Sequence, residues 1–142
     1  MSWSRLKAKI EERFAPSLHS RVSVHMTSYR DAVSEGGRGW FLIDGTEVAL
    51  AKIQPYGESR APGQHDQWSL HDGLSSYLDL TIDQALVSSD PLHRALAMID
   101  RRLGRRRFEA LKLSTDEHPL VRQLHELRAT AEQWQSSVGG AA

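Results

Sequence analysis

The residues with the most distinctive chemistry are five arginines in the C-terminal half of the chain. Guanidinium groups present planar sets of donors that suit phosphate or carboxylate oxygens. If a helix breaks at Gly104, these side chains spread over one end of the domain. We therefore predict a binding site, here called the arginine group, that consists of Arg101, Arg102, Arg105, Arg106 and Arg107.

The charge pattern leaves three interpretations of the arginine group open. The chain has 18 Lys and Arg against 18 Asp and Glu, so no net charge favours nucleic acid or membrane. The segment before the group is acidic, with seven acids against two arginines from Gln54 to Asp100. The arginines could pair with these acids, bind nucleic acid or another polyanion, or bind an acidic protein partner.

Two His-Asp pairs, His65-Asp66 and His71-Asp72, are the only residues that suggest a metal. A zinc site needs three or four converging ligands. The first pair falls in a Gly- and Pro-containing stretch, and Asp72 is expected to cap a helix. We predict surface residues, no metal and no cofactor.

Other catalytic signals are weak. His25 and Tyr29 lie on the polar face of a predicted strand, where a general base could sit, but the sequence places no partner beside them. No nucleophile-elbow, zinc-helix or dinucleotide motif is present, although a Ser, His and Asp could still converge in the fold. Gly36 and Gly37 precede a strand rather than a helix, so we predict a plain loop instead of a phosphate site.

The central predicted element is a hairpin around Asp44-Gly45, the dipeptide typical of a two-residue turn with positive φ. This turn pairs Ile43 with Thr46, Phe41 with Val48, and Gly39 with Leu50. Phe41 and its neighbours on that face are expected to face the core.

Before the hairpin, the apolar spacing of Trp3, Leu6, Ile10 and Phe14 predicts a helix from Trp3 to Ala15, capped by Ser2. The alternation of apolar and polar residues from Arg21 to Tyr29 predicts a strand. The segment from Asp31 to Arg38 is predicted to be a flexible loop. These segments complete a three-stranded meander.

After the hairpin, Gln54 to Gln67 is predicted to be a long connection, and the remaining chain is helical. Helix starts are expected at a Ser69/Asp72 capping box, at Thr81, at Asp90-Pro91 and at a Ser114-to-Glu117 capping box. The Asp90 helix is expected to run to a left-handed Gly104. The other predicted segments are a short helix over Arg105 to Leu113, a last helix reaching Trp134 and a disordered tail from 136 to 142.

The fold class is therefore α+β, with a small three-stranded antiparallel meander packed against an N-terminal helix and a C-terminal group of helices. We expect a single domain over residues 1–135. The chain has no cysteine, no signal-peptide pattern and no apolar run of membrane-spanning length, so a cytoplasmic location without membrane association is expected.

Several of these segments also resemble a known family: Trp3-Ser4, Arg13-Phe14, Gly37 to Trp40, Asp90 to Leu92, Asp100 to Gly104, and Asp116 to Val121. Together they resemble a family of small bacterial cytoplasmic proteins to which no activity is assigned. The resemblance implies a single bacterial domain and adds no site residues.

The combined sequence evidence favours a non-catalytic cytoplasmic module that binds an unknown protein partner. The alternative is binding of nucleic acid or another polyanion through the arginine group. An enzyme is the third hypothesis.

Overall fold

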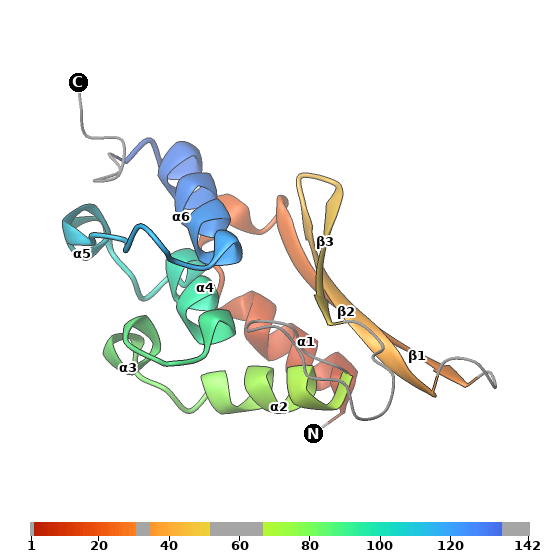
Figure 1. Cartoon of the computed structure of the whole chain (residues 1–142). Helices are drawn as coiled ribbons and strands as arrows, with labels where there is room; N and C mark the ends of the chain where they lie inside the picture. Colours follow the sequence, from red (N-terminus) through yellow and green to blue (C-terminus); the bar gives the residue numbers. More distant parts are fainter. Residues whose placement is uncertain (1, 31–34, 52–66, 135–142) are drawn as a thin grey trace. The chain divides into compact units, whose positions relative to one another are not determined.

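The computed structural model describes residues 2–30, 35–51 and 67–134, which form an N-terminal helix, an open three-stranded antiparallel sheet and further helices (Figure 1). This confirms the α+β class. The chain divides into two compact units, Met1–Glu12 with His19–Asp79 and Arg13–Leu18 with Leu80–Ala142. They are called unit 1 and unit 2 below, and the expectation of a single domain stays a prediction.

Unit 1 begins with α1, Trp3–Glu12, in which Leu6 and Ile10 are buried as their helical spacing predicts. The Ser2 hydroxyl accepts a hydrogen bond from the Arg5 N–H at 3.4 Å, in agreement with the predicted cap. The predicted end at Ala15 is wrong. Phe14 is not on the helix stripe and instead forms a β-bridge in unit 2.

The sheet has the order β1-β2-β3, with β1 at Val22–Arg30, β2 at Glu35–Ile43 and β3 at Thr46–Ala51. Two predicted hairpin pairs are confirmed, because Ile43 faces Thr46 and Phe41 faces Val48. Phe41 is fully buried. The predicted pairing of Gly39 with Leu50 is wrong: a register shift between Gly39 and Trp40 places Gly39 opposite Ala51.

The predicted loop from Asp31 to Arg38 is also partly wrong. Residues 31–34 lie outside the described part of the chain, but residues 35–38 belong to β2 and pair with residues 27–30 of β1. The low strand propensity of Gly36 and Gly37 is outweighed by the backbone hydrogen bonds of this ladder.

The turn between β2 and β3 has the backbone that its sequence predicts, with φ of 51° at Asp44 and 83° at Gly45. Arg21 fixes it to the start of β1. Its guanidinium donates two hydrogen bonds of 2.8 Å to the Asp44 carboxylate, and its carbonyl accepts the Asp44 N–H. The hydrogen bond from Arg21 holds the pKa of Asp44 below its ordinary value.

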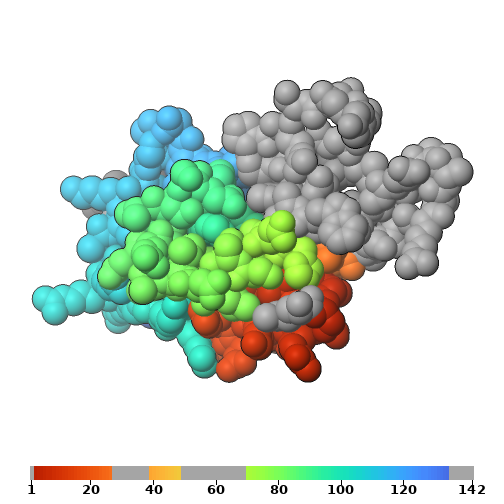
Figure 2. All heavy atoms as spheres, turned by 90° about the horizontal axis from the view of Figure 1, so that it is seen from below, coloured from red at the N-terminus to blue at the C-terminus, as the bar shows by residue number. Residues whose placement is uncertain are grey.

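The last element of unit 1 is α2, Gln67–Tyr77, which contacts all three strands and lies beside α1 (Figure 2). Leu70, Leu74 and Tyr77 are buried. The predicted capping box is wrong, because Ser69 lies inside the helix rather than at its start. Gly39 of β2 lets α2 approach closely, since a Cβ at this position would overlap the end of the Leu70 side chain unless that side chain moved.

Unit 2 contains the short 3-10 helix η1, Pro16–Leu18, followed in the chain by α3, Ile82–Leu86, and α4, Pro91–Ile99. The predicted starts of both α-helices are confirmed. Thr81 and Gln84 form a capping box at α3, and the Asp90 carboxylate accepts the Leu92 N–H at α4.

The predicted extension of α4 to Gly104 is wrong. The helix ends at Ile99, because the next residues pair with the segment that follows α1. The Arg101 N–H donates to the Arg13 carbonyl at 2.7 Å, and the Ala15 N–H donates to the Ile99 carbonyl at 2.8 Å. Gly104 has φ −83° and precedes α5 instead of closing α4.

The last two helices are α5, Arg105–Ala110, and α6, Pro119–Glu132. The Ser114-to-Glu117 capping box is wrong, since α6 is capped by His118, whose Nδ1 accepts the Leu120 N–H at 3.1 Å. Leu120, Leu124 and Leu127 are buried as predicted. Trp134 lies beyond the helix, after Gln133 at φ 60°.

The predicted connection from Gln54 and the predicted tail from 136 fall mostly or wholly outside the described residues. In the described part of the chain, none of the helices has the length and apolar character needed to cross a membrane.

Replacing Gly45 by Val is expected to lower the free energy of unfolding by about 1 to 2 kcal/mol, because a β-branched residue resists positive φ. No atom lies within 4 Å of a Cβ at this position, so the cost comes from the backbone alone. The matched control is Gly104→Ala, at an equally open position with negative φ, where only the replacement of a glycine N-cap is expected to cost stability, and that cost should be smaller than for Gly45→Val. Urea denaturation of both variants measures the difference, and equal stabilities would contradict the turn.

Candidate functional site

The arginine group is divided between the α4–α5 connection and α5. Arg101 and Arg102 lie in the connection, whereas Arg105, Arg106 and Arg107 form the first half of α5. Successive helical residues point about 100° apart, so three consecutive arginines spread around the helix instead of sharing one face. Phe108, the next residue, is fully buried and anchors α5.

Arg102 has a structural role. Its guanidinium donates to both carboxylate oxygens of Asp100, at 2.9 Å from Nη2 to Oδ2 and 3.1 Å from Nε to Oδ1. Its Nη1 donates to the Leu80 carbonyl at 3.0 Å. Because the Asp100 side chain is wholly buried, this ion pair is needed to compensate its charge. Arg102 is therefore not available to a ligand.

Two of the three α5 arginines form ion pairs at the surface. Arg105 Nε lies 3.2 Å from Glu109 Oε1, one turn along the same helix, and Arg107 pairs with Asp83 of α3. Arg106 is exposed, and no partner is recorded for it in residues 2–30, 35–51 and 67–134. Arg101 is exposed as well. The structure thus separates one structural arginine from four on the surface.

A buried arginine that the sequence analysis missed supports the backbone of the arginine group. Arg128 of α6 is 2% exposed and donates to three carbonyl oxygens: Met98 at 3.2 Å, Asp100 at 2.9 Å and Leu103 at 2.9 Å. The end of a helix leaves carbonyls without intrahelical donors, and Arg128 supplies donors at the end of α4. The sequence did carry a signal that Arg128 is buried: it lies four residues after Leu124 and so falls within the apolar stripe of α6.

Opposing effects act on the charge of Arg128. Burial lowers its pKa from the ordinary value, and the carboxylate of Glu132, 3.2 Å away, acts in the opposite direction. The guanidinium also lies 4.7 Å from the centre of the Trp134 ring, a cation–π contact. Trp134, the last residue of the predicted apolar stripe, thus helps to stabilise the buried Arg128 guanidinium by lying against it.

Replacing Arg128 by Met should lower the free energy of unfolding by about 3 kcal/mol or more, because buried carbonyls lose their donor. Arg122→Met, on the same helix but partly exposed, is the control and should cost less than about 1 kcal/mol. Chemical denaturation monitored by circular dichroism measures both. A loss for Arg128→Met no larger than that of the control would contradict the structural role.

His125 lies next to the anchor of α5. Its ring stacks on Phe108 with centroids 4.4 Å apart, and it is 2% exposed. Its Nε2 has no hydrogen-bond partner among the described residues. Burial lowers the pKa of His125, and the nearby Glu126 opposes this only as the smaller effect. The neutral imidazole is therefore the form that supports α5.

Because the folded pKa of His125 is lowered, its stabilising contribution is present above the unfolded value of about 6.5 and is lost as the pH falls below it. We expect the free energy of unfolding to decrease between pH 7 and pH 5, by up to about 1.4 kcal/mol per pH unit from this group. In the His125→Phe variant, the free energy of unfolding should fall less between pH 7 and pH 5 than in the wild type. In the His19→Gln variant, which changes an exposed site, it should fall as much as in the wild type. Equal slopes in all three proteins would contradict the assignment to His125.

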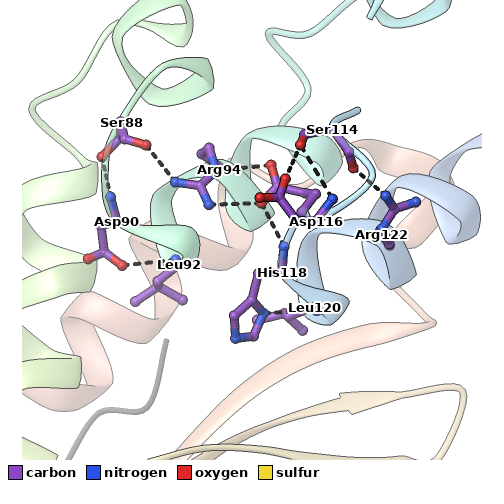
Figure 3. Close-up of polar contacts among 10 residues, drawn as sticks. Ser88, Asp90, Leu92, Arg94, Ser114, Asp116, His118, Leu120 and Arg122 are labelled. Atoms are coloured by element: carbon purple, nitrogen blue, oxygen red, sulfur yellow. Dashed lines mark hydrogen bonds and ion pairs between the residues drawn. The ribbon is translucent and has the colours of Figure 1, made fainter. Parts of the chain in front are cut away.

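The structure brings together a serine, a histidine and an aspartate, as the sequence analysis left open. Ser88 Oγ lies 3.1 Å from His93 Nδ1, and His93 Nε2 lies 3.8 Å from Asp90 Oδ2. Ser88 and Asp90 also bind the backbone at the start of α4, because Ser88 Oγ accepts the Asp90 N–H and the Asp90 carboxylate accepts the Leu92 N–H (Figure 3). Ser88 Oγ and Asp90 Oδ1 thus cap α4, while Asp90 Oδ2 is the oxygen that lies near His93.

A second polar network joins α4 to the start of α6 (Figure 3). Arg94 donates to both oxygens of Glu117, at 2.8 and 3.1 Å, and to the Ser88 carbonyl at 2.8 Å. The hydrogen bond from Arg94 lowers the pKa of Glu117. Glu117 also accepts the His118 N–H, which fixes the residue that caps α6. This network has a structural function.

The remaining candidates that the structure describes do not assemble into a site. His65 and Asp66 lie outside the described residues, His71 is half-buried and Asp72 is exposed. In the described segments, no three His, Cys, Asp or Glu residues are grouped in a way that could hold a metal ion. His25 contacts Ser23 Oγ at 2.7 Å and stacks on Trp40, and burial lowers its pKa. The side chain of Tyr29 is not among those described.

These observations define an α+β protein in which a short surface helix carries three consecutive arginines and follows a connection whose carbonyls are bound by the buried Arg128. The chain belongs to the SF0329 protein family, which it matches over residues 2–62 and 50–129. The description of the family names no activity. No curated protein and no solved structure matches the chain.

Proposed function

We propose that this chain is a non-catalytic protein-interaction module whose binding surface is centred on α5. The observation that carries the proposal is the alternation of charge on this surface. Arg105 lies beside Glu109, Arg107 pairs with Asp83, and Arg106 is exposed between them.

The geometry of α5 gives Arg106 the leading role. At 100° per residue, Arg106 points about 160° away from Phe108, which is directed into the core. Arg105 and Arg107 lie on the two flanks, close enough to their acids to form ion pairs. Arg106 is thus the side chain that a partner's carboxylate would meet first.

The acids next to the arginines favour a protein over a nucleic acid. A phosphate backbone presents negative charge alone and would be repelled by Glu109 and Asp83. A protein surface can offer both signs, and such complementarity determines the choice of partner. Exposed pairs are worth only about 0.2 to 1 kcal/mol, so they can rearrange on binding.

Support for a non-catalytic role comes from the histidines. His93 and His118 belong to helix caps, and His125 is stacked in the core. These three imidazoles are thereby used in holding elements in place. In keeping with the family resemblance, we place the module in the bacterial cytoplasm as a single domain.

The alternative is binding of nucleic acid or another polyanion through the exposed part of the arginine group. Arg101 adds a further exposed arginine in the connection before α5, which favours this alternative. Such binding releases counterions, so affinity would fall steeply as salt is raised.

Affinity capture from cell lysate, with and without nuclease, tests the proposal. The wild-type protein should retain a specific protein partner after nuclease treatment. Arg106→Glu should reduce capture of that partner by about tenfold or more, because it reverses the central charge. Arg5→Glu, an exposed arginine of α1 in unit 1, is the matched control and should leave capture unchanged.

Loss of the partner on nuclease treatment would contradict a protein interface and support the alternative. Fluorescence anisotropy with single- and double-stranded oligonucleotides at about 50 mM salt then decides it, since even non-specific contacts are strong there. Binding that weakens with salt and with Arg106→Glu would establish the polyanion site. Capture that is insensitive to Arg106→Glu would exclude α5 as the interface.

A further inference from the structure

The outer edge of β1 makes an unusual contact with α1 (Figure 1). The Val24 N–H donates to the Glu11 carboxylate at 2.9 Å, and the Val24 carbonyl accepts a hydrogen bond from Lys7 Nζ at 2.6 Å. Lys7 and Glu11, one turn apart on α1, are themselves joined by a 2.6 Å ion pair. Both backbone groups of one strand residue are thus satisfied by two side chains.

The direction of these backbone groups follows from the ladder. Along a strand, the N–H and C=O of successive residues point alternately to the two sides. The Val24 groups meet α1, so they point away from β2, and the same alternation directs those of Val22 and Met26 outward. β1 is an edge strand, since the sheet order is β1-β2-β3.

An edge strand of this kind is a template for another strand. Val24 sits between Val22 and Met26, so an incoming strand would need the Val24 N–H and carbonyl to continue its ladder. The Lys7–Glu11 pair occupies both, with an acceptor where a strand would place its carbonyl and a donor where it would place its N–H. We propose that the Lys7–Glu11 pair blocks strand addition at β1 and so prevents two copies of this chain from joining edge to edge.

A second copy is the partner that the geometry fits. Two identical β1 edges can pair antiparallel about a two-fold axis, which makes the contact self-complementary. The pair is well suited to its blocking role, because each side chain is 29% exposed and held by a hydrogen bond as well as the ion pair. Natural sheets protect their edges by charged side chains of this type.

The test is the self-association of the full chain, measured by analytical ultracentrifugation over a range of concentrations. Lys7→Ala with Glu11→Ala should lower the apparent dissociation constant for self-association by about tenfold relative to the wild type. Lys9→Ala with Glu12→Ala removes an exposed lysine and glutamate from the same helix and should match the wild type. A folded Lys7/Glu11 variant that sediments as the wild type does would overturn the proposal.

Two further variants keep the test decisive. Lys7→Ala alone leaves Glu11 hydrogen-bonded to the Val24 N–H. It should therefore lower the apparent dissociation constant for self-association by less than the double variant does. If the double variant fails to fold, an unshifted Lys7→Ala protein overturns the proposal. Met26→Pro, added to the associating variant, removes an outward N–H from β1 and should abolish the extra association. Association that persists in its presence would show that another surface is responsible.

Discussion

The connection between α4 and α5 depends on the buried guanidinium of Arg128. Three carbonyl oxygens, from Met98, Asp100 and Leu103, bind this one side chain. A positive charge in a protein interior is costly unless polar groups surround it, and here the backbone supplies most of them. The guanidinium and the turn of the chain therefore require each other. The position of Asp100, and through it that of Arg102, follows from this contact.

The consequence for the surface is that the arginine group is not a uniform patch. One member is fixed to Asp100, two are paired with acids on α3 and α5, Arg101 is exposed in the connection before α5, and Arg106 points outward. A run of basic residues in a sequence therefore overstates the charge that a ligand would meet. What remains is a surface of mixed sign, and its selectivity would depend on where the charges lie more than on their total.

The sequence predicted those elements whose signals are local. The Asp44-Gly45 turn, the Thr81 cap and the Asp90-Pro91 start depend on residues within a few positions of each other, and all three occur in the structure. The α+β class followed from the change of apolar period. The predicted helix start at Ser69 was wrong because α2 already begins at Gln67, and the start at Ser114 was wrong because His118 caps α6.

The remaining errors arise from long-range contacts that no local pattern reveals. α1 was predicted to include Phe14 because the spacing fits, but backbone pairing with the Asp100 segment ends it earlier. The same pairing ends α4 before Gly104. Arg128 was missed for a related reason, since its carbonyl partners lie 25 to 30 positions away. The candidate site could be named from the sequence, but its partition into structural and exposed arginines could not.

The assignment of residues 13–18 to unit 2 has a consequence for the order of folding during synthesis. Unit 1 is complete once the chain has reached Asp79, and its three strands are neighbours in sequence, so its sheet can form early. Residues 13–18 have by then left the ribosome, but Ile99 and Arg101, to which they bond, have not yet been made. Phe14 and Leu18, both buried in the finished protein, must wait for those later residues. During that interval the nascent chain carries an apolar segment without its partner, which is the condition under which chaperones act.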